Sequence, residues 1–258
     1  MSMRSPTCRE QEVSDITWKN GREVPMFMFR KGVAPAMPGH VQNLSRIWEE
    51  LLPLAVKKIR YKKESYFSFP DTEANTFGYI KSGHTGTIHP LFDGQEHIKF
   101  LISEGCLFRE SYIIAGFCNS FPLHRCLTDV EIYQFNGDML VDPAFAAAHP
   151  EHIRNVMWAM AVKQSSLDMI ADIVAQKTVA GKIANYLHIC SKVQGNSRFA
   201  PNITQLELSL MLNIHKSSLN RTLLNMQSMG IIDGFTKKKC TVLASEKLKA
   251  VADGVLVL

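Results

Sequence analysis

Apolar residues near the C-terminus recur at the spacing of two short helices. Thr204 and Glu207 form a capping box, which satisfies the first backbone donors of a helix and predicts that the helix begins at Gln205. Asn213 tolerates the left-handed backbone that a sharp turn needs, so the first helix is expected to end before it. The apolar face of this helix is expected to consist of Leu206, Leu210 and Met211.

The segment after Asn213 predicts a second helix and a hairpin. The second helix has an apolar side of Leu219, Leu223 and Met226 and a polar side of Lys216, Ser217, Ser218, Asn220 and Arg221. Gly230 ends it and begins a strand, Gly234–Lys239 is expected to form a turn, and Cys240–Leu243 is the returning strand. These segments predict a β-hairpin, or wing, with Lys237, Lys238 and Lys239 at its tip. The whole pattern predicts a winged helix-turn-helix that binds DNA through the polar side of the second helix, the wing lysines and Thr204.

The clearest periodic segment lies before this domain, between about residues 148 and 176. A 4-3 spacing connects Ile153, Met157, Met160, Gln164, Leu167, Ala171 and Val174. Such a seam predicts a parallel coiled coil and therefore the interface of a homodimer. The flanking residues Val156, Val162, Ile170 and Ile173 predict that another side of the same helix packs on its own chain. Further helices are expected at Thr178–Val193 and Ser245–Ala252.

Between about Val56 and Phe135 the pattern changes to short apolar runs separated by turns. The turns are Pro70-Asp71, Ser82-Gly83, Asp93-Gly94 and Glu104-Gly105. Strands at these intervals predict a sandwich or barrel. Ahead of it we expect a strand around Met26–Phe29 and a helix from Val41 to Leu52, ended by Pro53. That helix is expected to bury Leu44, Ile47, Trp48 and Leu51.

Charge is unevenly distributed along the chain. The formal net charge is +5, yet residues 177–258 contain eleven Lys/Arg and four Asp/Glu, whereas residues 1–176 contain eighteen and twenty. This asymmetry favours a polyanionic partner for the C-terminal third alone. The chain has no apolar run long enough for a membrane helix and no signal-peptide pattern, which predicts a cytoplasmic protein. Its six cysteines form no C-x-x-C pair, which predicts free thiols.

The order of capped helix, turn, polar helix and wing resembles the C-terminal domain of the cyclic-AMP receptor protein/FNR (CRP/FNR) superfamily of bacterial transcription regulators. The superfamily commonly has G-V-S-R-E-T-V-S-R where this chain has N-I-H-K-S-S-L-N-R, residues 213–221. Arg221 matches the second arginine, Lys216 replaces the first, and Ser217 replaces the glutamate. The runs at Gly78–Gly83, Phe92–Leu101 and Glu104–Ser111 resemble the β-roll sensor of the same superfamily.

The resemblance implies an α+β protein with three parts. These are an N-terminal antiparallel β-roll sensor (residues 1–147), a long central dimerisation helix (148–176) and a C-terminal winged helix-turn-helix (177–258). It also implies a palindromic double-stranded DNA operator, RNA polymerase as a further partner, no enzymatic activity, and an effector pocket bordered by the central helix. The matching pocket residues are Gly105, Phe108, Arg109, Glu110, Leu123, Met160, Lys163 and Gln164.

The expected effector is a small ligand other than cyclic AMP. Members that bind cyclic nucleotides use Gly-Glu and a later arginine to neutralise the phosphate. This chain has Arg109-Glu110, and no arginine follows between Phe117 and His124, so a buried cyclic phosphate would lack its counter-charge. A haem-dependent gas sensor of the same superfamily remains an alternative, as does a regulator of constant activity with a vestigial sensor.

A metal-dependent enzyme is the other alternative. His84, His89, His97 and His124 all lie in the strand-rich segment. Gly78 and His84 have the spacing that opens a cupin motif, but Gly86 stands where that motif requires its second histidine. The sequence therefore favours a regulator over a cupin-like enzyme with an incidental helical tail, and it predicts no metal site.

Overall fold

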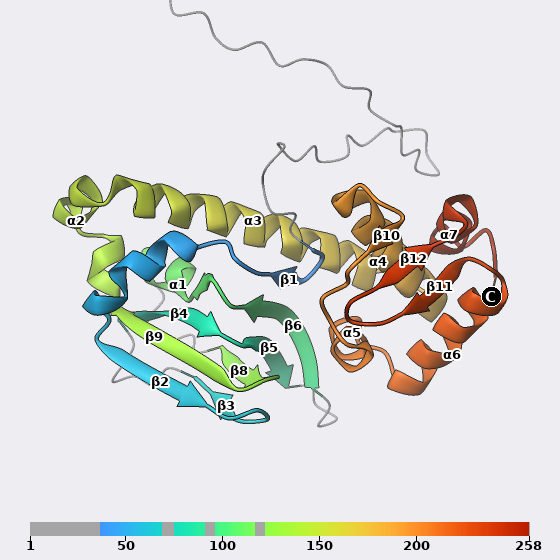
Figure 1. Ribbon diagram of the computed structural model, residues 1–258, viewed down its shortest axis with the longest axis horizontal. Coiled ribbons are helices and arrows are strands. Elements are labelled where there is room, and N and C mark those ends of the chain that lie inside the picture. The colour runs from blue at the N-terminus through green and yellow to red at the C-terminus, as the bar shows by residue number, and fades with distance from the viewer. Residues whose placement is uncertain (1–36, 69–74, 91–95, 117–121, 258) are drawn as a thin grey trace, which may run out of the picture. The chain divides into compact units, whose positions relative to one another are not determined.

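The computed structural model describes residues 37–68, 75–90, 96–116 and 122–257, and residues 36–258 form one compact unit (Figure 1). The strand expected at Met26–Phe29 and the turns at Pro70-Asp71 and Asp93-Gly94 lie outside the described residues. The same holds for most of the segment from Phe117 to His124 and for Cys8 and Cys118. The other four cysteines are free and buried, as expected.

Two sheets form the β-roll. Their strands are β1 (His40–Val41), β2 (Lys57–Tyr61), β3 (Tyr66–Phe67), β4 (Thr76–Ser82), β5 (His84–Pro90), β6 (Glu96–Ser103), β7 (Cys106–Phe108), β8 (Leu123–Cys126) and β9 (Val130–Asn136). One sheet has the order β1-β6-β5-β8-β3 and the other β2-β9-β4-β7. Apolar side chains from both sheets pack together, including Phe67, Ile80, Phe100, Cys126 and Ile132. The sandwich predicted from the short apolar runs separated by turns is thus present.

Two details of this region differ from the sequence expectation. Strand β1 pairs with β6 in parallel, which the long connection through η1 and strands β2 to β5 permits. The helix expected over Val41–Leu52 is a 3-10 helix, η1 (Arg46–Leu54), which contains Pro53. Its late start has a tertiary cause: the backbone amides of Asn43 and Ser45 donate to the carbonyls of Glu104 and Gly105, which holds the chain in a non-helical course up to Ser45. Leu44, Trp48 and Leu51 are buried as expected, and Ile47 is half-buried.

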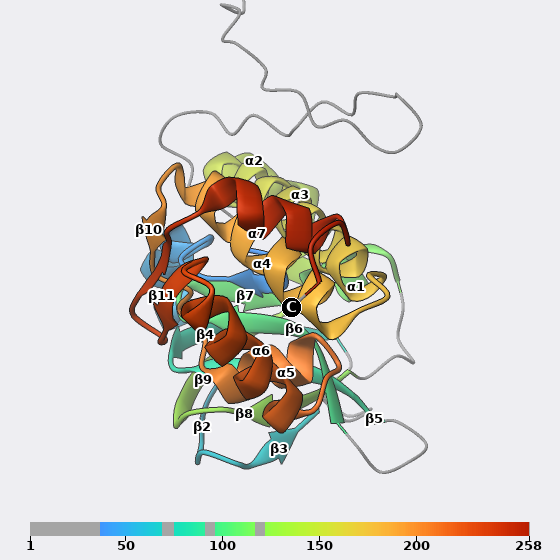
Figure 2. The same cartoon turned by 90° about the vertical axis from the view of Figure 1, so that its right-hand side faces the viewer.

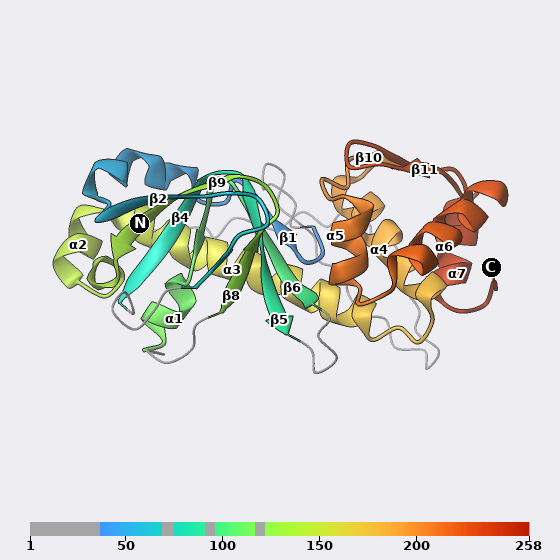
Figure 3. The same cartoon turned by 90° about the horizontal axis from the view of Figure 1, so that it is seen from below.

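Helix α3 (Pro150–Val174) runs along the sheets (Figures 1 and 3). Its inward stripe comprises His152, Val156, Ala159, Val162, Ser166, Ile170 and Ile173. The four flanking residues predicted to pack on the chain are all in this stripe. Short helices connect β7 to β8 and β9 to α3, namely α1 (Glu110–Ile114), η3 (Gly137–Leu140) and α2 (Pro143–Ala148).

The C-terminal part is helical with a small sheet (Figure 2). It comprises α4 (Val179–Gln194), β10 (Arg198–Phe199), α5 (Gln205–Met211), α6 (Lys216–Ser228), β11 (Ile232–Phe235), β12 (Cys240–Val242) and α7 (Ser245–Ala252). Its sheet has the order β10-β12-β11. Thr178 caps α4 by accepting from the Gly181 amide, and α7 has the predicted bounds. The predicted winged helix-turn-helix is confirmed in all its elements.

Candidate DNA-binding surface and effector site

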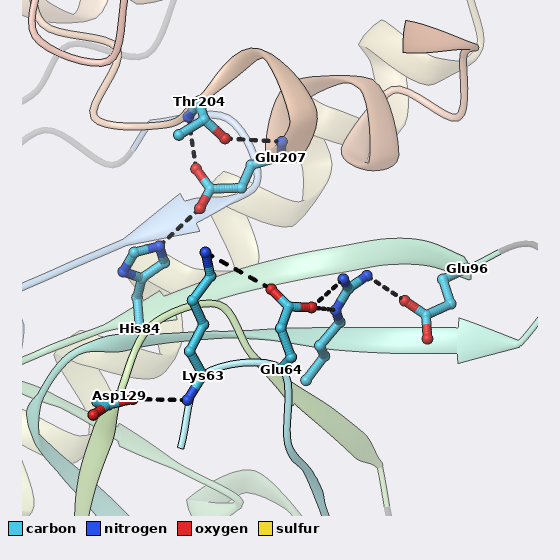
Figure 4. Close-up of polar contacts among 8 residues, drawn as sticks. Lys63, Glu64, His84, Glu96, Asp129, Thr204 and Glu207 are labelled. Carbon is cyan, nitrogen blue, oxygen red and sulfur yellow. Dashed lines mark hydrogen bonds and ion pairs between the residues drawn. The ribbon is translucent and has the colours of Figure 1, made fainter. Parts of the chain in front are cut away.

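The capping box at the start of α5 is complete. The Thr204 hydroxyl accepts from the Glu207 amide at 3.2 Å, and the Glu207 carboxylate accepts from the Thr204 amide at 2.6 Å. The other carboxylate oxygen of Glu207 lies 2.8 Å from Nε2 of His84 on β5 (Figure 4). Glu207 therefore joins the helix-turn-helix to the β-roll while it also caps α5.

The pKa of Glu207 reflects this double role. Burial is the largest single influence on this carboxyl group and raises its pKa. The hydrogen bonds from His84 and from the Thr204 amide, together with the charges of His84 and Lys237, outweigh burial and lower the pKa from 4.5 to about 2. The carboxylate is thus strongly held in its ionised form.

The predicted apolar face of α5 is partly wrong. Leu206 is 45% exposed, whereas Leu208 is completely buried and Met211 is buried as expected. Leu208 and Met211 share one apolar cluster with Ile88 and Ile98 of the β-roll, and His97 Nε2 lies 3.2 Å from the Met211 carbonyl. Because α5 packs on β5 and β6 as well as on α6, its buried side is rotated away from Leu206.

Helix α6 presents its polar side as predicted. Leu219, Leu223 and Met226 are buried, while Lys216, Ser217 and Arg221 are exposed. Ser218 and Asn220 are half-buried, and Asn220 Oδ1 has no hydrogen-bond partner among the described residues. The N-cap is His215, whose Nδ1 lies 2.7 Å from Ser217 Oγ and 3.4 Å from the Ser217 amide. His215 was not among the residues expected at this surface, because histidine is not one of the usual N-cap residues.

Arg221 is available for a ligand. Over the part of the chain that the structure describes, its guanidinium forms neither a hydrogen bond nor an ion pair. The acids before and after it in the domain sequence have other partners: Glu207 contacts His84 and the Thr204 amide, and Asp233 pairs with Lys239.

The three wing lysines differ in their surroundings. Lys237 and Lys238 are exposed, but Lys239 is half-buried and its ammonium pairs with Asp233 at 3.1 Å. The turn is closed by a hydrogen bond from the Thr236 amide to the Lys239 carbonyl at 2.8 Å. Lys237 and Lys238 are thus accessible to an anionic partner, whereas the Lys239 ammonium is paired with Asp233 of the same hairpin.

Four of the predicted effector residues lie close together where β7 meets α1 and α3. Phe108 and Glu110 are buried, and the Lys163 ammonium donates to the Glu110 carboxylate and to the Leu107 carbonyl, the latter at 2.7 Å. Arg109 is only 4% exposed, with φ at +68° in the left-handed region. A buried arginine next to a buried ion pair is unusual in a structural core, so this is the candidate effector site.

His124 belongs to the same site, although the sequence analysis considered it only as a metal ligand. Its ring stacks on Phe67 at 5.0 Å and meets Phe108 edge-on at 5.4 Å. Burial, reinforced by the charge of Arg109, lowers its pKa to about 3, and its Nε2 has no hydrogen-bond partner among the described residues. On β8, His124 and Cys126 are buried and the residues beside them are half-buried, because side chains alternate between the two faces of a strand.

The other four predicted effector residues lie elsewhere. Gly105 is in a turn at φ +73°, where an added Cβ would lie 2.9 Å from Asn43 Cα. Leu123 packs against the apolar cluster of the C-terminal helices, and Met160 against that of Trp48. Gln164 is exposed and donates to Asp168 on its own helix at 2.7 Å.

The predicted dimer seam lies on the open side of α3. Met157 is 61% exposed, and Gln164 and Ala171 are also exposed. Ile153, Met160, Leu167 and Val174 are half-buried. Among the described residues, this side of α3 is therefore only partly covered: three of its seven positions are exposed and four are half-buried.

Three of the four histidines considered as metal ligands have separate surroundings, and the side chain of the fourth, His89, lies outside the described part of the structure. His84 contacts Glu207, His97 contacts the Met211 carbonyl, and His124 lies among aromatic rings. In the described ranges, no three His, Cys, Asp or Glu side chains gather to hold a metal ion. None of the described helices combines the length and apolar character needed to cross a membrane.

Comparison with known proteins agrees with this geometry. Residues 181–251 match the Crp-like helix-turn-helix domain. The curated proteins contain no match to the chain. Solved structures with a similar fold include a CooA mutant from Carboxydothermus hydrogenoformans, with a TM-score of 0.64, 16% identity, and coverage of 82% of this chain and 96% of that one.

Two further solved structures have the same architecture. CprK complexed with OCPA has a TM-score of 0.61 at 13% identity, covering 82% of this chain and 97% of that one. The c-di-GMP-responsive global regulator CLP of Xanthomonas campestris has a TM-score of 0.57 at 18% identity, with 77% and 98% covered. Residues 181–251 are thus a Crp-like helix-turn-helix domain, and the chain has the fold of the CRP/FNR family of DNA-binding transcription regulators.

Proposed function

We propose that the protein is a homodimeric transcription regulator that binds a palindromic operator and is gated by a small ligand in the β-roll. The observation that carries the proposal is the exposed polar side of α6, on which Lys216, Ser217 and Arg221 project from a Crp-like helix-turn-helix. In such a domain the second helix enters the major groove with its N-terminal residues on base edges.

Arg221 is the proposed reader of guanine. Its planar fork can donate to O6 and N7 of one base, and its guanidinium is not engaged by the described part of the chain. Lys216, at the first position of α6, is a second donor with less directional chemistry. Both side chains project from a rigid helix, which supports a role in sequence recognition.

Lys237 and Lys238 are the proposed phosphate contacts of the wing. Exposed ammonium groups displace counterions from DNA, and that contribution is independent of sequence. Lys239 contributes less, because its ammonium must first leave Asp233. Thr204 stays a proposed contact at the exposed start of α5.

A second copy of the chain is proposed to cover the seam of α3. A largely apolar, partly exposed stripe on a long helix whose opposite side is buried fits a two-stranded interface. A symmetric pair would present two recognition helices to two half-sites. The division into a sensor (1–147), a dimerisation helix (148–176) and a DNA-binding domain (177–258) is part of this proposal.

The effector is proposed to be a small ligand other than cyclic AMP, bound near Phe108, Arg109, Glu110, Lys163 and His124. These residues combine buried charge with aromatic faces, which is typical of ligand sites. A ligand that shifts β7, α1 or α3 would change the orientation of the DNA-binding domains through a two-state dimer.

The proposal is tested by selecting duplexes from a random library with the full chain and measuring affinities by fluorescence anisotropy at several salt concentrations. Arg221→Ala should weaken the selected operator by roughly 1–3 kcal/mol and relax one base position. Lys237→Gln with Lys238→Gln should weaken operator and random DNA alike and flatten the salt dependence. Lys247→Gln on α7 removes an exposed charge away from this surface and serves as the control. Selection of no sequence at all would refute the proposal.

A further inference from the structure

The N-cap of the recognition helix is a histidine that holds a neighbouring base-facing side chain. His215 caps α6 with an extended backbone (φ −68°, ψ 137°), and its ring turns back over the first turn of the helix. Nδ1 lies 2.7 Å from Ser217 Oγ and 3.4 Å from the Ser217 backbone nitrogen. Both His215 and Ser217 are exposed, at the end of α6 that faces base edges in this type of domain.

The two contacts of Nδ1 together indicate which nitrogen of His215 carries the proton and which way the Ser217 hydroxyl hydrogen points. A backbone N–H is always a donor, so the approach of the Ser217 amide to Nδ1 requires a lone pair on that nitrogen. In the neutral imidazole the proton is then on Nε2. The hydroxyl of Ser217, at the shorter distance, must therefore donate its only hydrogen to Nδ1.

A serine hydroxyl that already donates its hydrogen can only accept further hydrogen bonds. Serine normally suits any base edge because its hydroxyl rotates and can donate or accept. With its hydrogen on Nδ1, Ser217 Oγ can only accept, as a carboxylate does. In the major groove the exocyclic amino groups of cytosine (N4) and adenine (N6) are the donors, whereas guanine and thymine present acceptors to a single side chain.

We infer that His215 is a specificity-determining residue: it fixes the hydrogen-bond polarity of Ser217, so that Ser217 selects cytosine or adenine at one position of each half-site. The inference rests on the proposed function, since it requires that α6 enter the major groove. It extends that function by naming the kind of base that Ser217 accepts and the residue that imposes the choice.

The test compares base preference in four full-length proteins by duplex selection, followed by affinities for operators that carry each base at the Ser217 position. The proteins are wild type, Ser217→Ala, His215→Ser and the control Ser228→Ala, which removes a hydroxyl from the far end of α6. His215→Ser keeps a side-chain cap for the helix but removes the ring that takes the Ser217 hydrogen. Base ratios are the readout, so a uniform change of affinity cancels.

Wild type and Ser228→Ala should prefer an amino-bearing base at one position by about twofold to tenfold, the range of one neutral hydrogen bond. Ser217→Ala should lose the preference at that position alone. His215→Ser should lose it too, because the freed hydroxyl accepts or donates with equal ease.

Three results would overturn the inference, and they can be told apart. A preference for guanine or thymine that disappears in Ser217→Ala would show the opposite polarity. An undiminished cytosine or adenine preference in His215→Ser would show that His215 does not impose the choice. If wild type selects no sequence at all, the proposed function fails and the inference with it.

Discussion

Replacing Glu207 with glutamine tests whether one carboxylate stabilises both α5 and its contact with the β-roll. The substitution keeps the shape of the side chain and removes its charge. In the native chain the two carboxylate oxygens accept from His84 at 2.8 Å and from the Thr204 amide at 2.6 Å. Glutamine has one acceptor oxygen, so if the Thr204 amide keeps its acceptor, the amide nitrogen of glutamine faces His84 and the charge-assisted bond to His84 is lost.

The magnitude follows from the pKa of Glu207. A shift from 4.5 to about 2 is about 2.5 pKa units, and at about 1.36 kcal/mol per unit it corresponds to about 3 kcal/mol of stability. Because the pKa is lowered in the folded state, this stability is fully present above pH 4.5 and is lost as the pH falls towards 2. The side chain is only 7% exposed, so screening by solvent removes little of it.

Urea unfolding of the full chain, followed from pH 7 to pH 2, measures the effect. We expect Glu207→Gln to lower the free energy of unfolding by about 2–3 kcal/mol at pH 7, with the deficit shrinking below pH 4.5. His84→Gln and the double variant complete a cycle, and a coupling above about 1 kcal/mol is expected for a direct contact. A deficit at pH 7 below about 0.5 kcal/mol, or one that stays constant down to pH 2, would refute the reasoning.

Three further predictions concern the other sites. Met160→Glu with Leu167→Glu should place like charges across the proposed two-fold axis and give monomers that lose operator binding; a monomeric wild type in sedimentation would contradict the seam. Cyclic AMP at millimolar concentration should leave the melting temperature and DNA affinity unchanged, and a clear stabilisation would show that the β-roll accepts a cyclic phosphate. His124 is held neutral with a pKa of about 3, so the native state should lose stability as the pH falls from 6.5 towards 3, and a His124→Gln variant should show a weaker loss over that range.

The sequence by itself determined the elements whose causes are local. The Thr204–Glu207 capping box lies within four residues, and it fixed the start of α5. The 3.6-residue repeat of Leu219, Leu223 and Met226 fixed which side of α6 is buried and therefore that Lys216 and Arg221 face outward. The helical period likewise predicted which side of α3 packs on the chain and which side faces away from it.

Only the tertiary structure decided the contacts between distant segments. His84 and Glu207 are 123 residues apart, and no local pattern pairs them. Leu206 became exposed because α5 packs on β5 and β6, and η1 starts late because Asn43 and Ser45 bond to the turn after β6. Arg109 and His124 come together inside the β-roll through sheet packing. Helical periods and caps act over a few residues, whereas burial and partner choice depend on which surfaces the folded chain brings into contact.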